Sequence, residues 1–279
     1  MDLADIHRDI ELGLLMDDPK IVASAISRKP ELGAEICHRA ACAGSLEVFK
    51  WADSNECSWK HGVCASAAAN GHLEILKYAH EKGYPWNYYV CSIAAANGHL
   101  DILKYARANN CPWDSDVCAL AAHSGHLEIL QWARASGCPW GPNVCENAAT
   151  FGHFEILKWA HNEGCPWGPK TCAEAAYHGD LEILKWLRSS GCPWDSGTCV
   201  RAAAGGHTHI LEWVRSEGCP WSANACVRAI KYGQLETLKW AVHNGCPWKP
   251  TQYLSQAAKH PHVQEWIRSW ISEHSAGHH

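Results

Sequence analysis

The sequence predicts an all-α fold, an α-solenoid in which short helix-turn-helix units are stacked side by side. Cysteines recur at multiples of 27 residues in two parallel series. Glycines divide each 27-residue unit into two stretches that show the apolar spacing of helices. A helix of about ten residues is not stable alone, so each unit has to be stabilised by its neighbours.

The repeat is clearest in residues 111–137, which read CPWDSDVCALAAHSGHLEILQWARASG. Later units follow in the same frame without a gap, at 138–164, 165–191, 192–218 and 219–245. Earlier units also keep it, at 57–83 and 84–110 with Ser58 and Tyr84 as exceptions, and at 30–56 in part. The first series is Cys57, Cys111, Cys138, Cys165, Cys192, Cys219 and Cys246, and the second is Cys37, Cys64, Cys91, Cys118, Cys145, Cys172, Cys199 and Cys226.

Along the chain, residues 1–29 are expected to form an N-terminal capping unit, because they keep only a few apolar positions in phase. Residues 30–245 are expected to form eight repeats. Residues 246–274 are expected to form a C-terminal capping unit, and 275–279 a disordered tail. The C-terminal cap shows one helical stripe of apolar side chains, namely Val263, Trp266, Ile267, Trp270 and Ile271.

Within each unit, the first helix is expected to begin four or five residues after the first cysteine. Asp114 can cap it, and Asn87, Asp195 and Ser222 stand at the same position; Pro142, Pro169 and Pro250 stand one residue further on. Its apolar strip is narrow and made of small side chains, so another helix can approach closely. In residues 111–137 this helix ends at Gly125, and the second helix is expected to end at Gly137.

Composition excludes several classes of protein. With 47% hydrophobic and 19% charged residues, the chain is not intrinsically disordered. A net charge of −5 makes nucleic acid an unlikely partner. Acidic residues stand near the N-terminus where a secretory signal would need a basic start, so we expect no signal peptide, and no run of apolar residues is long enough to span a membrane. We therefore expect a soluble, intracellular, cytoplasmic monomer, with the nucleus left open, whose cysteines are reduced and buried.

The stretch Ala-Ala-x-x-Gly-His-Leu-Glu-Ile-Leu-Lys resembles the core of the ankyrin repeat; it ends at Lys77, at Lys104 with Asp101 in place of Glu, and at Gln131. The ankyrin unit of 33 residues starts with Thr-Pro-Leu-His, which is absent here. The six missing residues fall where ankyrin repeats project a β-hairpin finger, so the resemblance implies that Cys-Pro-Trp replaces the finger with a tight loop. Units with this spelling look like divergent arrays of large DNA viruses and some protists. The resemblance implies a protein-interaction scaffold.

Two chemical alternatives were weighed against packing. The repeated Cys, Cys and His could bind zinc or act in redox chemistry, as in Cys111, Cys118 and His126. Their spacing is unlike that of zinc modules, and members are lost unit by unit, so we expect no metal and no cofactor. The two tryptophan columns could stack bases, but we expect them to pack in the core. No motif indicates an enzyme.

Function is therefore expected in the residues that differ between units. The predicted function is a non-enzymatic scaffold that binds protein partners along a concave surface made by the first helices and loops. Tyr88 and Tyr89 are the strongest candidates, because exposed tyrosines give interface area at low entropic cost. The full set of predicted partner-binding residues is Tyr88, Tyr89, Asp116, Leu120, Asn143, Asn147, Phe151, Glu174, Tyr177, Arg201 and Arg228.

Overall fold

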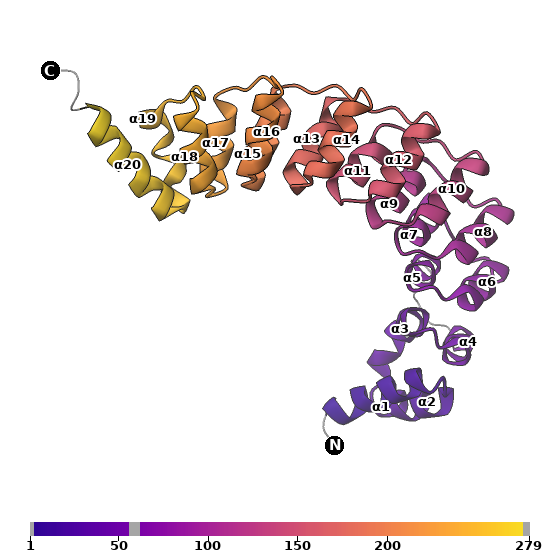
Figure 1. Cartoon of the computed structure of the whole chain (residues 1–279). Coiled ribbons are helices and arrows are strands. Elements are labelled where there is room, and N and C mark those ends of the chain that lie inside the picture. Colours follow the sequence, from indigo (N-terminus) through magenta and orange to yellow (C-terminus); the bar gives the residue numbers. More distant parts are fainter. Residues whose placement is uncertain (1–2, 56–61, 276–279) are drawn as a thin grey trace. The chain divides into compact units, whose positions relative to one another are not determined.

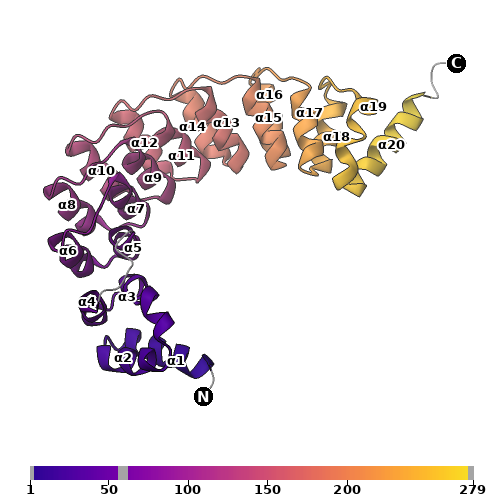
Figure 2. The same ribbon diagram turned by 180° about the vertical axis from the view of Figure 1, so that it is seen from behind.

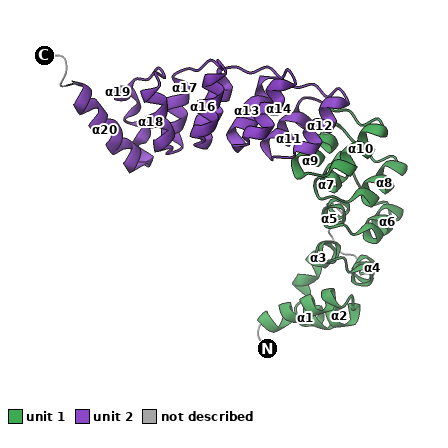
Figure 3. Ribbon diagram, in the orientation of Figure 1, with its two compact units in different colours: residues 1–140 green, residues 141–279 purple. Residues whose placement is uncertain are grey.

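A computed structural model describes residues 3–55 and 62–275. These residues form helices joined by short loops, and none of them lies in a β-strand. The chain divides into two compact units, unit 1 at Met1–Trp140 and unit 2 at Gly141–His279 (Figure 3). The all-helical prediction is confirmed. Cys57, Trp59 and His61 lie outside the described residues.

Unit 1 begins with two helices and a 3-10 helix, followed by helix pairs. Its elements are α1 (Leu3–Leu15), α2 (Pro19–Arg28), the 3-10 helix η1 (Pro30–Glu35), α3 (Ile36–Ala43), α4 (Leu46–Ser54), α5 (Val63–Asn70), α6 (Leu73–Glu81), α7 (Tyr88–Ala96), α8 (Leu100–Ala108), α9 (Ser115–Ser124) and α10 (Leu127–Ala135).

Unit 2 continues the helix pairs and ends on a longer helix. Its elements are α11 (Asn143–Thr150), α12 (Phe154–Asn162), α13 (Pro169–His178), α14 (Leu181–Ser189), α15 (Ser196–Gly205), α16 (Thr208–Ser216), α17 (Asn224–Lys231), α18 (Leu235–His243), α19 (Pro250–Tyr253), the 3-10 helix η2 (Gln256–Lys259) and α20 (Pro261–Ser275).

Within each unit the first helices of successive pairs pack against one another, as α5 on α7 and α13 on α15. Figures 1 and 2 show α5, α7 and α9 in one row, with α6, α8 and α10 in a second row beside them. The first helices approach closely because their shared faces carry Cys and Ala. Each second helix buries a larger triplet under the first row, such as Ile129, Leu130 and Ala133 in α10.

The helix boundaries follow the capping residues in most repeats. Asp114 accepts a hydrogen bond from the Asp116 N–H at 3.0 Å, and Asn87 and Asp195 cap their helices in the same way. Gly125 ends α9 with a positive φ of 83°. Two predictions were wrong: α17 begins after Ala223 without a side-chain cap from Ser222, and Pro142 precedes α11 rather than opening it.

The cysteines and tryptophans occupy different layers. The free cysteines in the described residues are buried, apart from the half-buried Cys42, which confirms their expected place in the core. Cys37 departs from the expectation of reduced thiols, because it is disulfide-bonded. The tryptophans were wrongly expected in the core, because every described tryptophan is only half-buried.

Candidate functional site

The repeated histidine at the start of the second helices is used in packing. The Nε2 atom of His99 lies 3.3 Å from the Ala69 carbonyl oxygen in the preceding repeat. His72 contacts the Cys42 carbonyl at 3.0 Å, and His207 the Tyr177 carbonyl at 3.0 Å. In each case the ring satisfies a carbonyl at a helix C-terminus, where no backbone partner remains. These imidazoles therefore connect each of these repeats to the preceding one by a hydrogen bond.

The predicted zinc alternative is not supported by any cluster. No group of three or more His, Cys, Asp or Glu side chains in residues 3–55 and 62–275 could hold a metal ion. The thiol of Cys111 is instead hydrogen-bonded with that of Cys91, which belongs to the preceding 27-residue unit. The equivalent histidine of the preceding unit, His99, contacts the Ala69 carbonyl.

The Cys-Pro-Trp loops are clamped by a basic or imidazole side chain from the preceding helix. Arg134 Nη1 donates to the Cys138 carbonyl at 2.7 Å, and its guanidinium lies 4.2 Å from the centroid of the Trp140 ring. In two repeats a histidine replaces the arginine and stacks on the loop tryptophan: His80 on Trp86 at 3.9 Å and His161 on Trp167 at 3.8 Å. The tryptophans are therefore engaged in holding the loops.

Several predicted binding residues in unit 2 are brought together on the first helices. The Arg201 guanidinium on α15 forms an ion pair with the Glu174 carboxylate on α13 and lies 3.9 Å from the centroid of the Tyr177 ring. Because Glu174 and Arg201 neutralise each other, they offer less charge to a partner than the sequence indicated. Arg228, on α17, is exposed.

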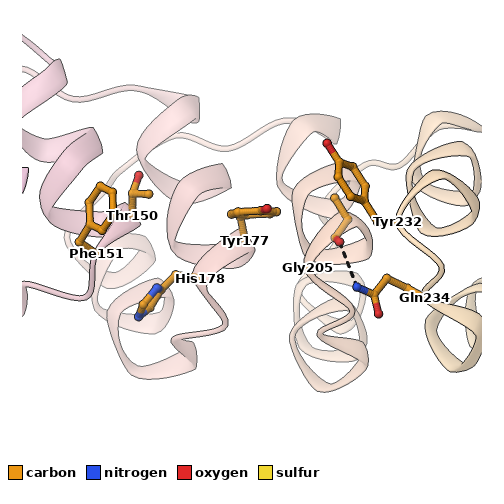
Figure 4. Close-up of a pocket in the computed structure, with 8 residues that line it drawn as sticks. Thr150, Phe151, Tyr177, His178, Gly205, Tyr232 and Gln234 are labelled. Atoms are coloured by element: carbon orange, nitrogen blue, oxygen red, sulfur yellow. Dashed lines mark hydrogen bonds between the residues drawn. The ribbon is translucent and has the colours of Figure 1, made fainter. Parts of the chain in front are cut away.

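The C-terminal ends of four first helices line a pocket of about 540 Å³ in unit 2 (Figure 4). Two of its walls are the exposed rings of Tyr177 and Tyr232. Between them, the repeat of α15 has Ala204 and Gly205 where its neighbours have large side chains, and this leaves the recess. Its lining residues are Thr150, Phe151, Tyr177, His178, Ala204, Gly205, Tyr232 and Gln234.

A smaller recess of about 110 Å³ shares two lining residues with this pocket, Ala204 and Tyr232. Its other lining residues are Val200, Arg201 and Arg228. The two recesses together form what we call the aromatic groove, defined by the residues that line either of them. It has aromatic walls, a floor of small side chains and one exposed arginine.

The remaining predicted residues lie apart from this groove. Tyr88 and Tyr89 open α7 in unit 1, and each ring is 50% exposed. Asp116 is exposed in the first turn of α9, and Leu120 is half-buried on the same helix. In α11 of unit 2, Asn143 and Asn147 are half-buried.

The predicted set omitted part of the aromatic groove. Tyr232, His178 and Gln234 line it, together with the small residues Ala204 and Gly205. The sequence holds a signal that could have found them: the turn between the two helices carries aromatic residues in three repeats and an Ala-Gly pair in the repeat of α15. A small pair between large neighbours predicts a recess.

This architecture defines a class of protein, the helical-repeat arrays. A family model described as ankyrin repeats (many copies) matches residues 64–107, which span α5 to α8. The helix pairs in residues 64–107 are therefore similar to ankyrin repeats, and repeats of this family generally mediate protein–protein interactions. A comparison with curated proteins finds no match. None of the described helices has the length and apolar character needed to cross a lipid bilayer.

Proposed function

We propose that the protein is a non-enzymatic scaffold that binds protein partners through its first helices and the turns that follow them, with the aromatic groove as its main contact. The observation that carries this proposal is which side chains form the walls of the groove. Its walls are side chains that differ between repeats, whereas the repeated Cys, His and Trp are engaged within the stack. The capping units at 1–29 and 246–274 are proposed to close the ends of the array.

The chemistry of the groove favours a partner segment with an apolar side chain beside an acidic one. The apolar side chain would lie between Tyr177 and Tyr232 over Ala204, where it loses contact with water. The acidic group would meet Arg228 and Lys231, which are exposed on α17. Electrostatic complementarity of this kind increases the rate of association and the specificity for the partner.

The test compares the wild-type chain with the double variant Tyr177→Ser/Tyr232→Ser. Proteins captured by the wild type are purified, and their affinities for both chains are measured by titration calorimetry. We expect the double variant to bind the partner about 30-fold more weakly, the effect of losing an aromatic hot spot. The matched control is Glu182→Ser/Lys185→Ser, which alters exposed side chains on the second helix α14. Equal affinity of the groove variant and the wild type for every captured protein would contradict the proposal.

The tyrosine pair in unit 1 gives a second prediction. Tyr88→Ala with Tyr89→Ala should leave the midpoint of thermal unfolding nearly unchanged, because both rings are half exposed to solvent. The same variant should weaken a partner complex that extends onto unit 1. Thermal unfolding followed by circular dichroism, with titration of the partner, measures both. A large drop in the unfolding midpoint would show that the rings support the fold instead.

A further inference from the structure

Most of the buried cysteines in the described residues are arranged as dithiols. Cys91 on α7 hydrogen-bonds through its thiol to Cys111, which follows α8. Including this one, six such contacts join a first-helix cysteine to the loop cysteine that closes its hairpin. The pairs are Cys91–Cys111, Cys118–Cys138, Cys145–Cys165, Cys172–Cys192, Cys199–Cys219 and Cys226–Cys246.

The loop thiol of each pair donates a hydrogen bond to a backbone carbonyl. The Cys111 thiol donates to the Asn87 carbonyl at 3.3 Å, and the Cys138 thiol donates in the same way to Asp114 at 3.3 Å. The loop cysteine thus satisfies a carbonyl beside a helix start. The helix cysteine of the first pair, Cys91, is fully buried, and its thiol meets the loop sulfur. On α3, Cys37 stands at the position equivalent to Cys91 and is already disulfide-bonded.

We propose that these six pairs are disulfide-forming sites, each of which closes one helical hairpin covalently, and that a low-molecular-weight disulfide of the glutathione type is the oxidant. The loop thiolate attacks one sulfur of the glutathione disulfide and releases one glutathione thiolate. The helix thiolate then attacks the loop sulfur of the mixed disulfide and releases the second. Two protein thiols are oxidised, one disulfide is reduced, and the two thiol protons end on two glutathione molecules.

The surroundings favour the loop cysteine as the first nucleophile. The pKa of the Cys111 thiol is lowered because the Cys91 thiol hydrogen-bonds to it and the Arg107 guanidinium lies nearby. The pKa of Cys91 is raised by that same hydrogen bond and by burial. Arg107 also donates to the Cys111 carbonyl at 2.5 Å, so release of this clamp opens the loop and exposes its sulfur to the oxidant.

The chain contains two internal controls. Cys64 on α5 is buried, but Tyr84 replaces its loop partner and donates to the Asp53 carboxylate at 2.6 Å. Burial raises the pKa of the Cys64 thiol to about 12. Cys42 is half-buried and lies beside His38, at 3.7 Å from Nε2. Among the described residues neither cysteine has a thiol partner of the paired kind, so both should stay reduced.

The experiment refolds the full chain from urea in buffers of increasing ratio of glutathione disulfide to glutathione. Refolding lets each thiol meet the oxidant before its hairpin closes. Remaining thiols are alkylated in denaturant, and the chain is digested without reduction for peptide mass mapping. We expect linked peptides with the six pairings and alkylation of Cys42 and Cys64. Alkylation of the paired cysteines at every ratio, or linked peptides with other pairings, would overturn the proposal.

A single variant separates a specific pairing from general oxidation. Cys118→Ser should remove only the Cys118–Cys138 link, leave Cys138 alkylated and keep the other five pairings. The oxidised wild type should also resist protease about tenfold longer than the reduced chain, because each link constrains a hairpin. A disulfide between Cys138 and another cysteine in this variant would contradict the proposed pairing. Equal rates of protease cleavage for the oxidised and reduced wild type would contradict the proposed disulfides as well.

Discussion

The glycine before the second helix α6 is constrained both by its own backbone and by a ring from the next repeat. Gly71 has a φ of +81°, and a Cβ atom placed there would lie 2.7 Å from the His99 imidazole. Gly83 has a similar φ of +76° but nothing within 4 Å. Gly71→Ala should therefore destabilise the chain by about 2 to 4 kcal/mol and Gly83→Ala by about 1 kcal/mol. Urea unfolding of both variants measures the difference, and equal losses would contradict the role assigned to His99.

One of the histidines that connect adjacent repeats, His207, also makes the free energy of unfolding depend on pH. Burial, followed by the neighbouring His209 and His178, lowers the pKa of His207 below its ordinary value of 6.5, although the hydrogen bond to Tyr177 opposes this. The unfolded chain then binds the proton more readily than the folded chain, so this stability is present above pH 6.5 and is lost as the pH falls toward the lower folded pKa.

The matched variant for this effect is His207→Gln, because the chain itself has Gln234 at the equivalent position, donating to Ala204 at 3.4 Å. Urea unfolding at about pH 7.5 and about pH 5.5 should show a smaller loss on acidification in the variant than in the wild type. An identical loss in both chains would mean that other groups cause the pH dependence.

At the scale of elements, the loop clamp supplies a further prediction. Arg188 on α14 donates to the Cys192 carbonyl at 2.5 Å and lies 4.1 Å from the centroid of the Trp194 ring. Arg188→Leu should reduce the free energy of unfolding by about 1 to 2 kcal/mol, because it removes a charge-assisted hydrogen bond and a cation–π contact. Lys185→Leu, an exposed position on the same helix, is the control. A loss no larger than that of the control would show that the clamp is not stabilising.

The elements themselves could be predicted because glycines and capping side chains mark their ends, as Asp114 and Gly125 do for α9. The degree of burial of the tryptophan side chains could not be predicted from the sequence. Trp194 belongs to a column of tryptophans at one fixed position of the repeat, and such a column is compatible both with a buried core and with a half-buried loop contact. The contact of Trp194 with Arg188, six residues earlier in sequence, distinguishes the two. The aromatic groove was predicted in part for a similar reason. Tyr177 is visible as an unusual side chain, whereas the recess depends on how small Ala204 is beside it.

For the whole chain, the repeat of 27 residues has a consequence that a single globular core does not have. Within each compact unit the first helices of successive hairpins contact one another, and the residues that form these contacts recur in frame. Stability should then be close to a sum of repeat and neighbour contributions, so a complete repeat can be removed without destroying the fold.

Deletion of residues 111–137, which removes α9 and α10 together, joins Asn110 to Cys138 and restores the Cys-Pro-Trp frame. We expect this variant to keep the helical content per residue and to unfold cooperatively at a lower urea concentration. Deletion of 111–124 removes α9 alone and leaves Ile129, Leu130 and Ala133 of α10 without the helix that covers them. That variant should bind a hydrophobic dye and aggregate. Circular dichroism, dye binding and gel filtration compare the two; equal behaviour would mean that the 27-residue hairpin is not the unit of folding.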